Sequence, residues 1–161
     1  MSHEHVKIKV IDAESPGSES VPALRLDDGS WELLSSPLYA TEIASGDVIK
    51  VLDKNSGSYE IIKRGGNVCI HFYLGEPHIN SESETAKAKS SVALKLSQLD
   101  GRIDASVSGL LSCTIPVNAG FNAIELVFNE LTKSFLGSQW QFTNVYNSTT
   151  GEPLMWWEPE T

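Results

Sequence analysis

The clearest strand pattern in the chain lies in residues 67–75, between two turn signals. Apolar and other side chains alternate there at the period of two that a β-strand requires. One face carries Val68, Ile70, Phe72 and Leu74, and the other carries Cys69, His71 and Tyr73. Because both faces look covered, we expect a central strand with helices packed on one side and another part of the protein on the other.

Short alternating segments precede this strand. We expect strands at residues 6–10, 21–26, 31–34, 48–52 and 59–62, with a loop over residues 12–20 and a hairpin turn at residues 27–29. Pro22 places the second strand at a sheet edge, or else Pro22 stands at its start. Tight turns between short strands favour a small, partly open barrel or a strongly bent sheet. Residues 1–64 are therefore predicted to form a β-barrel-like lobe, which docks on the Cys69 face of the central strand.

The first helix signal follows the central strand, after residues 75–77 stop regular structure. Ser81 and Glu84 have the spacing of a capping box, so a helix is predicted to begin at residues 81–83. Its apolar positions fall on one face, and they are Ala88, Val92, Leu96 and Leu99. Gly101 is expected to end the helix as a left-handed cap.

A second helix, residues 119–135, has the most regular pattern of the chain, with Asn118 as a candidate N-cap and Gly137 as the closing glycine. Its stripe consists of Phe121, Ile124, Phe128, Leu131 and Phe135. Steps of three and four residues indicate packing on a sheet. Further strands are expected at residues 103–107, 110–115 and 140–146.

The order of elements over residues 65–147 is thus strand, helix, strand, strand, helix, strand. Right-handed crossovers turn this order into a ferredoxin-like βαββαβ lobe, in which the strand at residue 67 lies beside the strand at residue 110. That arrangement should bring Cys69 and Cys113 near each other. The predicted class is α+β, with a Trp-rich C-terminal tail over residues 148–161.

The net charge of the chain limits the kinds of molecule that it can bind. The chain has 21 acidic and 12 basic side chains, a net charge of −9, and residues 103–161 hold six acidic side chains against Lys133 alone. A nucleic acid or an anionic membrane would be repelled, whereas a basic protein would be attracted. Two cysteines within apolar patterns, no apolar core of a signal peptide and no run of about 18 apolar residues lead us to expect a cytoplasmic protein.

A catalytic or metal site is not expected. Cys69 and His71 share a strand face, so a thiol and imidazole pair can be imagined with Cys113 beside it. No third group stands at a spacing that would orient the pair, and residues two apart on a strand lack the paired loops of zinc sites. We therefore expect a protein that is not an enzyme and carries no cofactor or metal.

Four fragments resemble, in their order and spacing, the landmarks of a known bacterial family. They run from Trp31 to Ala40, from Ile43 to Val51, from Arg64 to Ile70 and from Gly109 to Pro116. Together they look like the family called domain of unknown function 4265, over roughly residues 20–146. Some domains of this kind look like immunity proteins, which are encoded beside a secreted toxin and bind it in the producer's cytoplasm. The resemblance implies a noncatalytic protein that neutralises a cognate toxin.

The candidate partner surface combines tryptophans with carboxylates, and it consists of Asp104, Glu152, Trp156, Trp157, Glu158 and Glu160. Tryptophan is enriched at interface hot spots, and carboxylates on the rim steer a basic partner. A toxic nuclease is such a partner, because its own active site must attract phosphates. Two alternatives stay open: the tail folds back to cover the sheet, or the protein is a small-molecule-binding or regulatory module.

Overall fold

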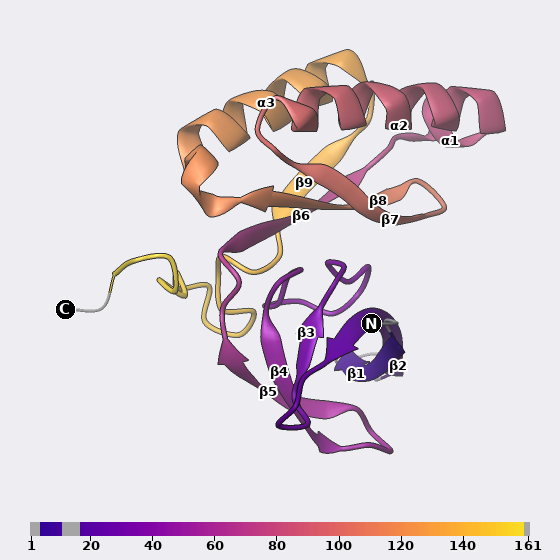
Figure 1. Ribbon diagram of the computed structural model, residues 1–161. Helices are drawn as coiled ribbons and strands as arrows, with labels where there is room; N and C mark the ends of the chain where they lie inside the picture. Colours follow the sequence, from indigo (N-terminus) through magenta and orange to yellow (C-terminus); the bar gives the residue numbers. More distant parts are fainter. Residues whose placement is uncertain (1–3, 11–16, 160–161) are drawn as a thin grey trace.

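The computed structural model describes residues 4–10 and 17–159 (Figure 1). These residues form two antiparallel sheets and three α-helices, which confirms the α+β class. The expected loop over residues 12–20 lies partly outside the described residues.

The N-terminal sheet contains the five strands expected from the sequence. They are β1 (Glu4–Val10), β2 (Gly17–Arg25), β3 (Trp31–Leu33), β4 (Val48–Asp53) and β5 (Ser58–Lys63). They lie in sequence order, and each is antiparallel to its neighbour. Between β1 and β5, Lys9 N donates to Gly57 O at 2.9 Å, but the described residues of these two strands form no ladder. The sheet is therefore not a closed barrel.

The prediction for Pro22 is wrong. Pro22 lies inside β2, opposite His5 of β1, and β2 is paired on both sides. A proline lacks the backbone donor but keeps the acceptor, and the Pro22 carbonyl accepts from Leu34 N at 2.9 Å. The sheet thus uses the one hydrogen-bonding group that this residue offers.

The C-terminal sheet has the strand order β7-β8-β6-β9, with every neighbouring pair antiparallel. Its elements are β6 (Asn67–Tyr73), α1 (Glu76–Ile79), α2 (Glu82–Ser97), β7 (Arg102–Val107), β8 (Leu110–Pro116), a 3-10 turn (Val117–Ala119), α3 (Phe121–Ser134) and β9 (Gln139–Phe142). The prediction that the strand at residue 67 lies beside the strand at residue 110 is confirmed by the pairing of β6 with β8.

Helices α2 and α3 cover one face of this sheet (Figure 1). The predicted faces are confirmed, because Ala88, Val92 and Leu96 of α2 are buried, as are the three central members of the α3 stripe. The Phe128 ring lies 6.0 Å from that of Phe72 and 5.4 Å from that of Trp140, between ring centroids. This aromatic contact joins α3 to β6 and β9.

The helix ends follow the sequence only in part. Ser81 caps α2, and its hydroxyl accepts from Glu84 N at 3.4 Å. The left-handed residue after α2 is Asp100 (φ 58°), not Gly101. Gly101 is needed for space instead, since a Cβ there would come within 2.7 Å of Ile115 Cγ1.

Two further predictions near helices are corrected. The N-cap of α3 is Gly120, and Asn118 lies in the preceding 3-10 turn. Short helix α1 occupies the stretch in which regular structure was expected to stop.

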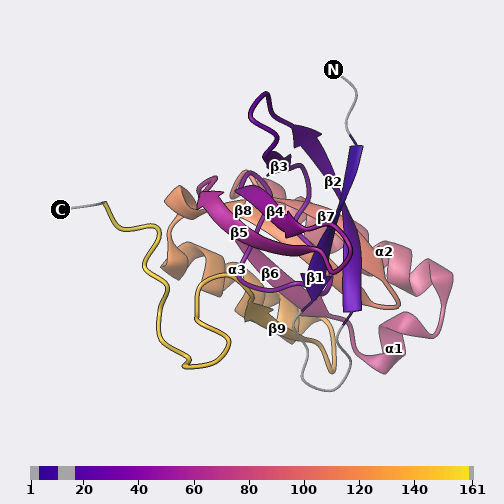
Figure 2. The ribbon, with the colours of Figure 1, turned by 90° about the horizontal axis from the view of Figure 1, so that it is seen from below.

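The N-terminal sheet lies on the face of the C-terminal sheet that the helices leave free, as the two views show (Figures 1 and 2). The chain crosses between the sheets at residues 64–66, where Gly65 touches the backbone of Gly46. A Cβ on Gly65 would come within 2.3 Å of the Gly46 carbonyl carbon. Glycine therefore permits the close approach of the two units.

The packing of α3 leads to a first prediction. Replacing Phe128, which is fully buried, by alanine should lower the free energy of unfolding by about 3–5 kcal/mol, because the cavity cannot collapse completely. Leu126 stands on the same helix and is 62% exposed, so Leu126→Ala should cost less than about 0.5 kcal/mol. Urea unfolding followed by circular dichroism measures both, and equal losses would contradict the assigned helix face.

Candidate functional site

The two sheets meet in a buried polar layer, which is the most organised polar region that the structure describes. Strands β6 and β8 supply one side, and the loop between β3 and β4 supplies the other. The Ser112 hydroxyl donates to the carbonyls of Ser36 and Pro37, each at 2.9 Å. The Ser36 hydroxyl bonds with that of Thr114 and accepts from Ser45 N at 3.0 Å. Each unit thus satisfies polar groups of the other.

Asp104 belongs to this layer. Its carboxylate accepts from Ser36 N at 2.8 Å and from the Thr114 hydroxyl at 2.6 Å. It also pairs with Arg102 Nε at 2.6 Å, and its side chain is only 5% exposed. Arg102 in turn donates to the Ser45 hydroxyl at 2.7 Å. Asp104 therefore joins the two units instead of facing solvent.

A second carboxylate, Asp47, lies at the crossing between the units. It accepts from Gly65 N at 2.8 Å and from Ala44 N at 2.9 Å, and it pairs with Arg64 Nη1 at 3.3 Å. Burial raises the pKa of Asp47, while the two backbone bonds and Arg64 act in the opposite direction. A carboxylate with these partners fixes the loop, the crossing segment and Arg64 relative to one another.

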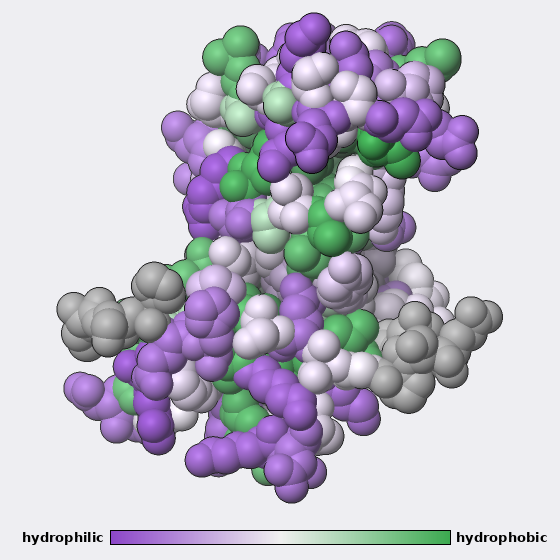
Figure 3. All heavy atoms as spheres, turned by 90° about the vertical axis from the view of Figure 1, so that its right-hand side faces the viewer, coloured by the Kyte–Doolittle hydropathy of each residue, from purple (hydrophilic) through white to green (hydrophobic). Residues whose placement is uncertain are grey.

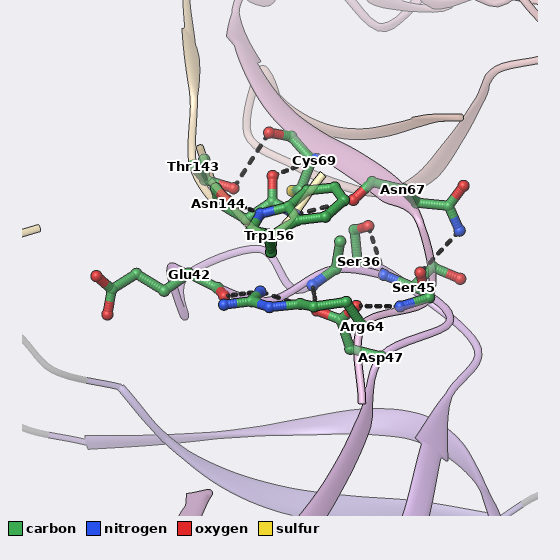
Figure 4. Close-up of polar contacts among 12 residues, drawn as sticks. Ser36, Glu42, Ser45, Asp47, Arg64, Asn67, Cys69, Thr143, Asn144 and Trp156 are labelled. Atoms are coloured by element: carbon green, nitrogen blue, oxygen red, sulfur yellow. Dashed lines mark hydrogen bonds and ion pairs between the residues drawn. The ribbon is translucent and has the colours of Figure 1, made fainter. Parts of the chain in front are cut away.

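The segment after β9 completes the layer (Figure 4). The Asn144 amide accepts from Cys69 N at 2.8 Å and donates to Asn67 O at 2.9 Å. Trp156 Nε1 donates to Asn144 O at 2.7 Å, and the Arg64 guanidinium stands 5.6 Å from the Trp156 ring centroid. The tail is thereby tied to both sheets.

Cys69 and His71 lie inside the same layer. Burial raises the pKa of the Cys69 thiol to about 11, so the thiol stays protonated near neutral pH. His71 Nε2 lies 2.9 Å from the Pro37 carbonyl oxygen, and burial lowers the pKa of the imidazole. The nucleophile and the base are therefore held in their neutral forms, away from solvent.

Cys113 lies on the strand beside that of Cys69, as expected, but its side chain does not face this pair. Cys113 lies opposite Ile70 in the register, whereas Cys69 lies opposite Thr114. Paired residues share a face, so Cys113 points into the helix-covered core while Cys69 points toward the N-terminal unit. Two adjacent strands carry the cysteines, but on opposite faces of the sheet.

Of the six partner residues predicted from the sequence, the five that the structure describes do not form one surface. Asp104 lies on β7, one edge of the C-terminal sheet, while the tail follows β9 at the opposite edge. Trp156 and Trp157 are half-buried, with ring centroids 5.4 Å apart, and Trp157 also packs on Phe121 at 5.1 Å. Glu152 and Glu158 are exposed, and Glu160 lies outside the described residues.

Neither a metal site nor a membrane span emerges in residues 4–10 and 17–159. No group of three or more His, Cys, Asp or Glu side chains there is arranged to hold a metal ion. None of the helices in these ranges is long and apolar enough to cross a membrane.

Pattern reasoning alone did not single out Asp47, Arg64 or Asn144. Asp47 and Arg64 lie in loops, where periodicity carries no information, and Asn144 was assigned to a strand over residues 140–146 that ends at Phe142 in the structure. A usable signal was present nonetheless, because Asp47 and Arg64 stand in the fragments that carry the family resemblance. All four of those fragments contribute residues to the polar layer, for instance Ser36, Asp47, Arg64 and Thr114.

Fold and layer together define an α+β protein in which two antiparallel sheets are joined by buried hydrogen bonds and ion pairs. The model of a family described as domain of unknown function (DUF4265) matches residues 19–138, and the chain belongs to this family. A hypothetical protein from Neisseria gonorrhoeae, described as a novel crystal structure, is similar with a TM-score of 0.65. At 17% identity over 89% of this chain and 95% of that one, the likeness concerns the fold alone. No curated protein matches the chain.

The Asp47 contacts lead to a second prediction. In Asp47→Asn only one side-chain atom can accept, so either Gly65 N or Ala44 N would face an amide NH₂ group. The free energy of unfolding should fall by about 1–3 kcal/mol, the usual cost of an unsatisfied buried donor. Glu125→Gln, the same kind of change on the exposed side of α3, should stay within about 0.5 kcal/mol. Urea unfolding would contradict the assigned role if both variants behaved alike.

His71 gives a third prediction, about pH. Because burial lowers the pKa of folded His71, the unfolded chain binds a proton more readily below its ordinary pKa of about 6.5. The stability that neutral His71 contributes is complete above that pH and is lost as the pH falls toward the lowered folded value, with a slope of at most about 1.4 kcal/mol per pH unit. Urea unfolding at pH values from 7.5 to 5 measures the free energy of unfolding. Its dependence on pH should be weaker in His71→Gln than in the wild type, and an identical dependence would disprove the assignment.

Proposed function

We propose that the protein is a noncatalytic immunity protein, which binds a cognate secreted toxin of the nuclease type and covers its active site. One observation carries the proposal. The side chains able to do chemistry, Cys69 and His71, are enclosed between the two sheets, whereas the charge of the molecule lies elsewhere and is strongly negative. Such a molecule acts through its surface.

The negative charge does not belong to the polar layer. Asp47 is paired with Arg64 and Asp104 with Arg102, so each pair is neutral. The net charge of −9 is therefore carried by residues other than these four. A basic partner would be steered toward such a molecule, and its association would be faster at low ionic strength.

The surface also offers apolar contacts. Figure 3 shows hydrophilic side chains over the helix layer and much of the N-terminal unit, with more apolar side chains around the narrow middle of the molecule. Exposed large apolar residues include Tyr39, Tyr73, Leu126 and Met155. Aromatic and aliphatic anchors surrounded by charge are typical of protein interfaces.

A nuclease suits this surface, because its own active site must attract phosphates and is therefore basic. The resemblance described in the sequence analysis points the same way, since some domains of this kind look like immunity proteins. The producing cell would hold the complex in its cytoplasm.

We also propose that the architecture is a β-barrel-like lobe followed by a ferredoxin-like βαββαβ lobe. The strand order β7-β8-β6-β9 and its antiparallel pairs support the second description. The same strand order supports the alternative function, a small-molecule-binding or regulatory module, because ferredoxin-like sheets often serve that purpose. An enzyme using Cys69 is the weaker rival, given the raised pKa of its thiol.

The proposal predicts that the protein protects cells from a toxin encoded by a neighbouring gene. Co-expression should restore growth, and the purified pair should elute together in size-exclusion chromatography, with association slowing as salt is added. Cys69→Ser should protect as well as the wild type, whereas an enzyme using this thiol would lose its effect. A pair that neither rescues growth nor elutes together would refute the immunity function.

A further inference from the structure

The open seam of the N-terminal sheet contains a cavity. Strands β1 and β5 are its edge strands, and they touch where Lys9 N donates to Gly57 O. Gly57 fits tightly there, since a Cβ would come within 2.8 Å of the Ile8 carbonyl carbon. Next to this contact lies a cavity of about 330 Å³, lined by Lys9, Glu42, Ser58, Tyr59 and Ile61. Its size falls at the lower end of ligand pockets.

The apolar wall of this cavity consists of Tyr59 and Ile61. Both side chains are partly buried and pack against the core of the N-terminal sheet. They are held by the fold and offer an aromatic ring and an aliphatic surface to an incoming group. Such a wall suits the hydrocarbon stem of a long side chain.

Glu42 is held in place by contacts of its own backbone. Its φ of 70° is rare for a residue other than glycine. The conformation is maintained because Glu42 N donates to Thr143 O at 2.8 Å and Glu42 O accepts from Arg64 Nη1 at 2.6 Å. The carboxylate accepts from Ser148 N at 2.9 Å and points away from Arg64 (Figure 4). Strained residues held in this way are concentrated at functional sites.

Three carboxylates and one guanidinium act on the phenol oxygen of Tyr59. Burial raises the pKa of Tyr59 to about 12, and the charges of Glu42, Asp47 and Glu19 act in the same direction. Only Arg64 opposes them, and its guanidinium is already bound by Asp47 and the Glu42 carbonyl. On the rim, Lys9 is exposed, and among the described residues that line the cavity it alone carries a positive charge.

We propose that this cavity receives a lysine or arginine side chain of the protein partner. The charged head would pair with Glu42, and the stem would lie on Tyr59 and Ile61. This inference rests on the proposed function, because a basic toxin is the partner that supplies such a side chain. It places a binding hot spot on Glu42 of the N-terminal unit instead of on the tryptophans of the tail.

Three variants that each change one charge test the cavity. Glu42→Gln keeps an acceptor for Ser148 N and should weaken binding of a catalytically inactive toxin by about tenfold or more. Lys9→Gln removes the opposing charge on the rim and should tighten binding by about twofold or more. Glu60→Gln, on the exposed side of the same strand β5, is the matched control and should change affinity by less than about twofold.

Titration calorimetry at low salt measures the three affinities, and urea unfolding confirms that each variant is folded. If the wild type itself fails to bind the toxin, the proposed function is overturned together with this inference. If the wild type binds while Glu42→Gln and Glu60→Gln have equal affinity, the cavity is not the site, although the function stands. Lys9 is exposed, so Lys9→Gln remains a test even if Glu42→Gln does not fold, and unchanged or weaker binding would count against the cavity.

Discussion

The contact between the two sheets is made by directed hydrogen bonds, and the rest of the molecule depends on it. An apolar contact would be satisfied by many relative orientations, because the hydrophobic effect has no direction. Ser36 and Asp104 each have partners from both units, and Asp47 holds the crossing segment, so one orientation satisfies all three. Among the described residues, no buried side-chain nitrogen or oxygen lacks a hydrogen bond. A fully satisfied polar layer of this kind fixes the orientation of its neighbours.

Local periodicity was enough to predict most elements and the helix-covered face. The stripe from Phe121 to Phe135 and the alternation from Val68 to Leu74 arise from contacts with one continuous core, and such contacts repeat with the period of the element itself. Right-handed crossovers then placed β6 beside β8 without further information. Features that follow from local geometry and chain topology can therefore be predicted from a single sequence.

Contacts that depend on the register between strands could not be predicted from the sequence. A shift of one residue moves a side chain to the other face of a sheet, and for this reason Cys113 was expected beside Cys69 but lies in the opposite core. The bulge of β7 near Asp104 likewise turns a carboxylate that looked like part of an acidic surface toward Ser36 and Thr114. The predictions for Pro22 and Gly101 were wrong for a related reason. The hydrogen bond that accommodates Pro22 and the limited space around Gly101 both come from segments distant in the sequence.

The four fragments that carry the family resemblance all contribute residues to the polar layer that joins the two sheets. The family match ends at residue 138, yet Asn144 and Trp156 beyond it complete the layer, and Thr143 and Ser148 bind Glu42. The carboxylate of Glu42 is thus positioned by the joint while facing away from it. In the proposed complex, the rigid inner layer would hold this outward-facing carboxylate in the geometry that its partner requires.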